Sequence, residues 1–232
     1  MATGPTPSGR ILDEIVASSR GLLVRSEGEP GTVHLWSLRE DVAIEREDGG
    51  GLLLVGPWGD ERIGDAHPVL REALYRMELG PVLLSNIEST PGVPMLGAGL
   101  YLILLPALRR LSHLIVRTLG LADLRGPLLS VLPLTRPAVF VLPRLGETEP
   151  VRLHRGVTLL LEAKGFRLER GGAQHRVLLH RPEPMWVVAM LAAAVTPEAV
   201  ARALPLPRTV TREILEYLAA AGMLVRGSGS GN

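Results

Sequence analysis

The feature that most constrains this sequence is an internal repeat of one plan, which starts first at Val42 and again at Val157. Each copy begins with short apolar segments separated by turn residues and continues into a helical pattern of apolar positions. With 232 residues, the chain is long enough for two small domains that each bury a modest core. The repeat therefore predicts two units of similar architecture.

The first copy reads as a three-stranded meander followed by helices. "VAIERED" alternates apolar and charged residues, and "GLLLVG" and "ERIGD" follow across the turns "GGG" and "PWGD". A first helix follows, with Asp65 as a candidate N-cap and Gly80 as its end. "PVLLSNI" then predicts a short second helix, and residues 98–120 predict a long third helix that Pro106 kinks.

The second copy repeats this order. "VTLLLEA", "FRLERG" and "QHRVLLH" predict three strands, the first two joined across Lys164 and Gly165. "PEPMWVVAMLAAA" predicts a first helix, Thr196 caps a second, and residues 209–225 predict a third helix that Gly222 terminates. We therefore expect an α+β chain of two tandem winged-helix-like units, each made of a three-stranded meander and three helices.

The predicted organisation has five parts. They are an N-terminal extension (1–30), a first winged-helix-like unit (31–120), a connecting segment rich in Leu and Pro (121–150), a second unit (151–226) and a flexible tail or linker (227–232). The connecting segment is expected to contain one or two strands that connect or brace the units.

Composition and charge exclude several classes of protein. The formal net charge is only +1, so no global field attracts nucleic acid or an anionic membrane, and the absence of cysteine excludes disulfides and thiolate metal sites. Asp13 and Glu14 interrupt the N-terminal apolar patch, which argues against a signal peptide. The strongly apolar part near "MLGAGLYLILL", from Met95 to Leu105, is too short to cross about 30 Å of hydrocarbon. A cytoplasmic protein with a buried helix there is expected.

No catalytic or metal-binding motif emerges from the sequence. The six histidines include no pair at metal-binding helical spacing backed by a carboxylate. Ser112 and His113 are adjacent, but adjacency does not place a nucleophile on its base, and no G-x-S-x-G occurs. "GPWGDERIG" lacks the strand-to-helix context of a dinucleotide loop and the Lys-Ser/Thr of a P-loop.

The arrangement resembles a known group of peptide-binding modules. "VAIEREDGGGLLLVGPWGDERIGDAHPVLREALYRMELG" resembles the PqqD-like recognition elements that act in maturation of ribosomally synthesised peptides. Residues 36–225 more specifically resemble the N-terminal half of SagB/ThcOx-type azoline dehydrogenases. "LSHLIVRTLGLADLRGPLLSVLPL" is similar to the segment leaving their first clamp, and "PVRLHRGVTLLLEAKGFRLERGGAQHRVLLH" to the segment opening their second.

In that family, two peptide clamps precede an FMN-binding nitroreductase-like domain that oxidises thiazolines or oxazolines to azoles. This sequence ends where that domain is expected, and Lys164 is interpreted as a solvated turn residue rather than a catalytic lysine. The resemblance therefore implies a non-catalytic, leader-peptide-binding and scaffolding subunit of an azoline dehydrogenase complex. The implied partners are a leader peptide and a flavin-binding nitroreductase-like subunit, with a cyclodehydratase as a further candidate. FMN is expected in a partner or a missing domain.

The mechanism that the resemblance implies is β-augmentation, in which a peptide pairs with the open edge of the third strand and lies against the third helix. In the first copy the implied contacts are Glu61, Arg62, Ile63 and Gly64 on the strand and Leu102, Leu105 and Arg109 on the helix. In the second copy they are Arg176, Leu178 and His180 on the strand and Arg212, Leu215 and Ala219 on the helix.

Other interpretations stay open at this point. The leucines are ordinary core residues in one of them, the arginines are solvated, and one copy has become scaffold. In another, the chain contributes residues to an FMN site shared with a second chain. A winged-helix DNA-binding regulator is a third, but the last helix offers only Arg208 and Arg212 near its start, beside Glu213 and Glu216, where a DNA reader needs several phosphate contacts.

Overall fold

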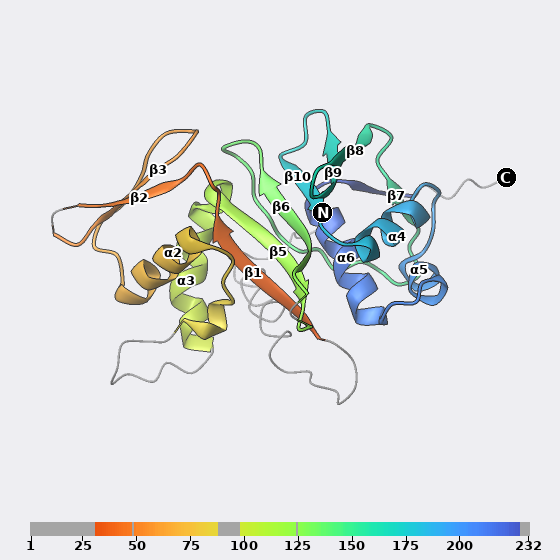
Figure 1. Cartoon of the computed structure of the whole chain (residues 1–232), viewed down its shortest axis with the longest axis horizontal. Helices are drawn as coiled ribbons and strands as arrows, with labels where there is room; N and C mark the ends of the chain where they lie inside the picture. The colour runs from red at the N-terminus through yellow and green to blue at the C-terminus, as the bar shows by residue number, and fades with distance from the viewer. Residues whose placement is uncertain (1–30, 48, 88–97, 124, 228–232) are drawn as a thin grey trace, which may run out of the picture.

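The computed structural model describes residues 31–47, 49–87, 98–123 and 125–227. The chain is a mixed α+β protein, as predicted, with its strands in three antiparallel sheets. The central sheet has six strands in the order β1-β5-β6-β10-β9-β8, and Figure 1 shows it running through the middle of the molecule. Both halves of the sequence contribute strands to this one sheet.

The helices and strands have the following bounds. The strands are β1 (Thr32–Leu38), β2 (Ala43–Arg46), β3 (Leu52–Val55), β4 (Glu61–Ile63), β5 (Ile115–Leu121), β6 (Pro127–Pro133), β7 (Val151–Leu153), β8 (Val157–Glu162), β9 (Gly165–Arg170), β10 (His175–Leu179) and β11 (Leu224–Arg226). The helices are α2 (Pro68–Leu79), α3 (Ala98–Arg110), α4 (Pro182–Met190), α5 (Pro197–Ala203) and α6 (Arg208–Ala220), with 3-10 turns at Leu84–Asn86 and Ser112–Leu114.

The meander of the first copy is confirmed, since β2, β3 and β4 form a three-stranded antiparallel sheet that α2 follows. The N-cap of α2 is not Asp65, as predicted, but His67, whose Nδ1 accepts a hydrogen bond from the Val69 amide at 3.3 Å. Pro68 then occupies the first turn, where its missing amide proton costs nothing. The helix ends before Gly80, as predicted.

The long third helix predicted for residues 98–120 is wrong in its second half. Helix α3 ends at Arg110, and the chain passes through a 3-10 turn into β5. Residues 115–121 pair with β1 on one side and with β6 on the other, so tertiary pairing overrides the helical pattern. The predicted short second helix is a single 3-10 turn. Met95 to Gly97, at the start of the predicted apolar helix, lie outside the described residues, and no helix within them combines the length and apolarity needed to span a bilayer.

The second copy follows its predicted order from β8, β9 and β10 through α4, α5 and α6. Thr196 caps α5 as predicted, with its hydroxyl accepting from the Ala199 amide at 3.2 Å. Helix α6 is shorter than predicted, because the chain turns at Gly222 and continues as β11, which pairs with β7.

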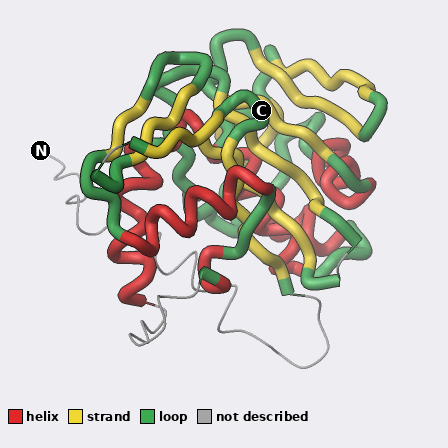
Figure 2. Tube along the Cα trace, turned by 60° about the vertical axis from the view of Figure 1, so that its left-hand side comes forward, coloured by secondary structure: helices red, strands yellow, loops and turns green. Residues whose placement is uncertain are grey.

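Strand β6 shows that the connecting segment does more than link the units. It pairs with β5 on one side and with β10 on the other, with Val131 opposite Val177 and Leu129 opposite Leu179. The sheet also joins the two apolar cores, because β5 places Ile115 in the core under α2 and α3 and Leu119 in the core under α4 and α6. Figure 2 shows these helices flanking the strands from a second direction.

The turn between β8 and β9 provides a test of this packing. Gly165 has a φ of +136°, and a Cβ there would lie 2.2 Å from the Leu179 carbonyl oxygen of β10. We predict that Gly165→Ala lowers the free energy of unfolding by about 3 kcal/mol, from overpacking and backbone strain together. Gly172→Ala is the matched control, since its φ is also positive but no atom lies within 4 Å, so only strain of about 1 kcal/mol is expected. Urea unfolding measures the free energy of unfolding of both variants. Equal losses in Gly165→Ala and Gly172→Ala would contradict the close packing of Gly165 against β10.

Candidate functional site

The first predicted peptide edge, β4, is an outer strand of its sheet, as expected. It is short, however, and the α3 side chain that reaches it is Arg110 rather than Arg109. The Arg110 Nη2 donates a hydrogen bond of 3.1 Å to the Arg62 carbonyl oxygen. The chain therefore already satisfies one of the backbone groups that a peptide strand would use.

The other predicted contacts of the first copy do not share one groove. Leu105 is buried in the core, as in the ordinary interpretation, whereas Leu102 on the same helix is 59% exposed. The Glu61 carboxylate receives Arg136 at 3.1 Å and lies 3.5 Å from His113 Nε2. The Ile63 side chain is buried in the first core, and Gly64 is exposed beyond the end of the strand.

The second predicted edge is wrong, because β10 is an inner strand with β9 on one side and β6 on the other. Arg176 pairs with Glu169, and His180 Nε2 lies 2.9 Å from the Ser130 hydroxyl. Leu178 lies opposite Ser130 and Arg167 on the two neighbouring strands. A peptide has no free edge to pair with at this strand.

The helical half of the second predicted site is also occupied. Arg212 forms an ion pair with Glu147, which lies beyond β6 in the sequence. Leu215 is fully buried in the second core, and Ala219 is half-buried. Leu215 is therefore a core residue, whereas Arg212 and Glu147 line an open surface recess at the start of α6.

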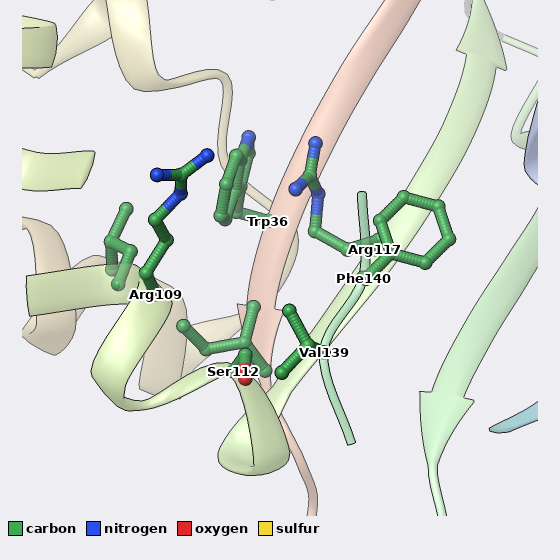
Figure 3. A pocket seen from close by; sticks show the side chains of 8 residues that line it. Trp36, Arg109, Ser112, Arg117, Val139 and Phe140 are labelled. Carbon is green, nitrogen blue, oxygen red and sulfur yellow. The ribbon is translucent and has the colours of Figure 1, made fainter. Parts of the chain in front are cut away.

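The structure instead brings Arg109 to a small recess between the C-terminal end of α3, strands β1 and β5, and the segment 138–141 (Figure 3). We call it the arginine recess. Its lining residues are Trp36, Leu108, Arg109, Ser112, Ile115, Arg117, Val139 and Phe140.

The floor of the arginine recess is a stack of a cation on aromatic rings. Trp36 and Arg117 are direct neighbours on β1 and β5, and the Arg117 guanidinium carbon lies 3.4 Å from the Trp36 ring centroid. The Phe140 ring centroid lies 5.1 Å from the same carbon. Arg117 is only 4% exposed, so these rings stabilise a charge that burial alone would destabilise.

One wall of the recess is the extended segment of residues 138–141. Its side chains alternate in burial, with Ala138 and Phe140 inside and Val139 and Val141 exposed. Ser112 anchors the segment, because its hydroxyl donates to the Ala138 carbonyl oxygen at 2.6 Å. An exposed apolar rim therefore borders the recess.

Arg109 and Arg117 are the charged residues among the eight that line the recess, and each also interacts with another group of the chain. Figure 3 shows Arg109 and Arg117 on either side of Trp36, with both guanidinium groups extending in the same direction. Guanidinium groups bind carboxylates in paired, charge-assisted hydrogen bonds, so the recess is suited to an acidic group flanked by apolar ones.

A buried polar cluster lies behind the recess and joins β1 to α6. His34 Nδ1 lies 2.9 Å from the Tyr217 hydroxyl, and the Tyr217 ring packs against Phe140 with centroids 5.2 Å apart. Glu213 Oε2 is 3.4 Å from His34 Nε2, but burial and then the charge of Arg117 lower the pKa of His34 to about 4. The imidazole is therefore neutral near pH 7.

Sequence reasoning missed three residues of this site, Trp36, Arg117 and Phe140. Trp36 belongs to β1, for which no strand was predicted, although "TVHLWSL" alternates in the manner of a strand. Arg117 lies in the part of the sequence assigned to the long helix, and Phe140 in the connecting segment. The pairing of β1 with β5 brings Trp36 beside Arg117, and the segment that follows β6 brings Phe140 to them.

The buried histidines make stability depend on pH. Burial lowers the pKa of His34 and of His175 to about 4, whereas an unperturbed histidine has a pKa of about 6.5, so the unfolded chain binds more protons between these pH values. We predict that the free energy of unfolding falls as pH drops from 7 to 5, by about 2 kcal/mol for each of the two histidines. When urea unfolding is measured at both pH values, the loss of stability between pH 7 and pH 5 should be smaller in His34→Gln by about 2 kcal/mol, the contribution of one histidine. An unchanged difference in that variant would contradict the burial of a neutral His34.

Comparisons with known proteins assign no family to this arrangement. No protein-family model matches the chain, and no curated protein is significantly similar to it. Among the described residues, no group of three or more His, Asp or Glu side chains is placed to hold a metal ion.

Proposed function

We propose that this chain is a non-catalytic, leader-peptide-binding and scaffolding subunit of an azoline dehydrogenase complex, with two winged-helix-like units. The arginine recess is the observation that carries the proposal. Arg109, one of the residues that the resemblance implies for peptide binding, borders it, although at a different place from the predicted strand edge. In both copies a three-stranded meander precedes the helices, which supports the proposed units.

The recess fits a peptide with an acidic residue among apolar ones. The acidic side chain pairs with Arg109 at the mouth of the recess, where Arg109 is half-buried and so less screened than a surface charge. The apolar residues on either side of it lie on Val139 and Val141, which are 53% and 41% exposed. Burying these side chains supplies affinity, and the arginine supplies selectivity.

The two copies take different roles in this proposal. The first holds the peptide, since the recess lies at the end of α3. The second is the scaffold, because β6 occupies the edge of β10 and Leu215 is buried in the second core. Duplication thus yields one binding unit and one supporting unit that share a sheet.

The lining of the arginine recess does not fit FMN by itself. Of the residues that line the recess, only Ser112 has a hydroxyl, and it already donates to the Ala138 carbonyl oxygen. A flavin phosphate needs several hydroxyl or backbone donors in a loop or at a helix N-terminus. In the proposed complex the flavin therefore belongs to the partner subunit.

The proposal predicts which peptides the chain selects. A library of random linear peptides displayed on phage is panned against the immobilised full chain, and a selected peptide is synthesised. We expect enrichment of Asp or Glu with apolar neighbours, and an affinity about tenfold weaker for Arg109→Gln, because one charge-assisted contact is lost. Fluorescence anisotropy measures both affinities.

Arg212→Gln is the matched control for this experiment. It removes the same charge at the position implied for the second copy, and its peptide affinity should equal that of the unmodified chain. Equal affinities for all three proteins, or a loss only in Arg212→Gln, would show that the arginine recess is not the peptide site.

A further inference from the structure

Strand β8 is an outer strand of the six-stranded sheet and, within the described residues, pairs only with β9. Five of its six residues are exposed. Three of them are consecutive leucines, Leu159, Leu160 and Leu161, and Leu161 is 78% exposed. An apolar open edge of this kind is a template for another strand.

The outer edges of β1 and β4 are partly closed. On β1, Trp36 exchanges two backbone hydrogen bonds of 2.9 and 2.8 Å with Val82. On β4, Arg110 caps the Arg62 carbonyl. The β8 edge therefore differs from both in combining backbone groups that face outward with an apolar surface.

The backbone of β8 shows which residues face outward. The Val157 amide donates to the His154 carbonyl oxygen at 2.9 Å and so points away from β9. Because backbone groups alternate along an antiparallel strand, Leu159 and Leu161 also direct their amide and carbonyl groups outward, and Leu160 directs them to β9. The two-residue turn at 163–164 supports this assignment. Glu162 and Gly165, the pair that closes the turn, are hydrogen-bonded to each other, so Leu160 bonds to β9 and Leu161 faces outward.

The side chains make one face of this edge apolar and place a single leucine among polar residues on the other. Leu159 and Leu161 lie on the same face as Leu168 and Phe166, their partners on β9, and extend the second core toward solvent. Leu160 lies on the opposite face. A strand that pairs with β8 therefore meets leucines above and below the sheet.

We propose that β8 pairs with β8 of a second copy of this chain, antiparallel about a two-fold axis, so that the two six-stranded sheets become one. Leu160 lies opposite Leu160 of the second copy, Leu159 opposite Leu161, and Thr158 opposite Glu162. The two outward residues, Leu159 and Leu161, then form the hydrogen-bonded pairs, and four leucines share one face.

The sequence of β8 favours a second copy as the partner, because its three leucines are symmetric about Leu160. No like charges face each other in this register. Shifting the register between the two strands in one direction would place Leu160 opposite Glu162. Shifting it in the other direction would require the Val157 amide to bond to the second copy, but this amide already donates to the His154 carbonyl oxygen. The strand is therefore its own best complement in one register.

Cysteine crosslinking tests this register directly, because the chain has no cysteine of its own. In the proposed dimer, Leu160 and its counterpart form a non-hydrogen-bonded pair, whose side chains approach closely enough for a disulfide. Leu160→Cys should give mostly covalent dimer under mild oxidation on a non-reducing gel. Leu161→Cys should give little covalent dimer, although Leu161 is more exposed. In the proposed register Leu161 lies opposite Leu159 of the second copy, so the two introduced cysteine side chains would be diagonal to each other and too far apart for a disulfide.

A second measurement reads the association without a crosslink. Analytical ultracentrifugation over a series of concentrations should show a monomer–dimer equilibrium, which is weak because one short strand makes a small interface. Leu160→Lys should raise the dimer dissociation constant at least tenfold. Leu79→Lys is the control, at a leucine that is 88% exposed on α2, and should leave it unchanged. Circular dichroism verifies that both variants fold.

Two results would overturn the proposal. One is an unmodified chain that stays monomeric at every concentration, whether or not a peptide from another source binds the edge. The other is equal crosslinking of Leu160→Cys and Leu161→Cys. Self-association does not depend on the arginine recess, which lies on β1, β5 and α3, so either proposal can fail without the other.

Discussion

The pairing of β6 with β10 is the interaction on which the rest of this structure depends. It closes the edge that a second peptide clamp would have left open and joins the strands of both copies into one sheet. Because the opposite side of β6 pairs with β5, the same strand fixes the position of Arg117 against Trp36. A segment that the sequence presented as a connection thus determines both the shape of the molecule and the location of its arginine recess.

Local patterns predicted the elements better than their partners. Alternation correctly indicated β2, short segments between turn residues correctly indicated β8, β9 and β10, and the Thr196 cap and the Gly80 stop were read from side-chain chemistry alone. The misassigned helix at residues 115–120 failed because a run of apolar residues suits a helix and a buried strand equally. Only long-range pairing decides between them, and a single sequence does not contain that information.

The candidate site was predictable only in part for the same reason. Arg109 was identified, but its companions Trp36, Arg117 and Phe140 come from three separate segments, and no spacing rule relates them. Leu105 and Leu215 proved to be core residues, since a leucine that faces a groove and one that faces a core have the same helical spacing. The predicted edge at β10 failed because a strand's pattern does not reveal whether a neighbour occupies its second side.

The central claim, that one copy binds peptide and the other supports it, is most directly tested by hydrogen–deuterium exchange of the full chain with and without a phage-selected acidic peptide. The account predicts slower exchange at residues 109–117 and 138–141 when the peptide is bound, and no change at His175–Leu179 in β10. Slower exchange confined to β10 and α6, with residues 109–117 unaffected, would contradict it.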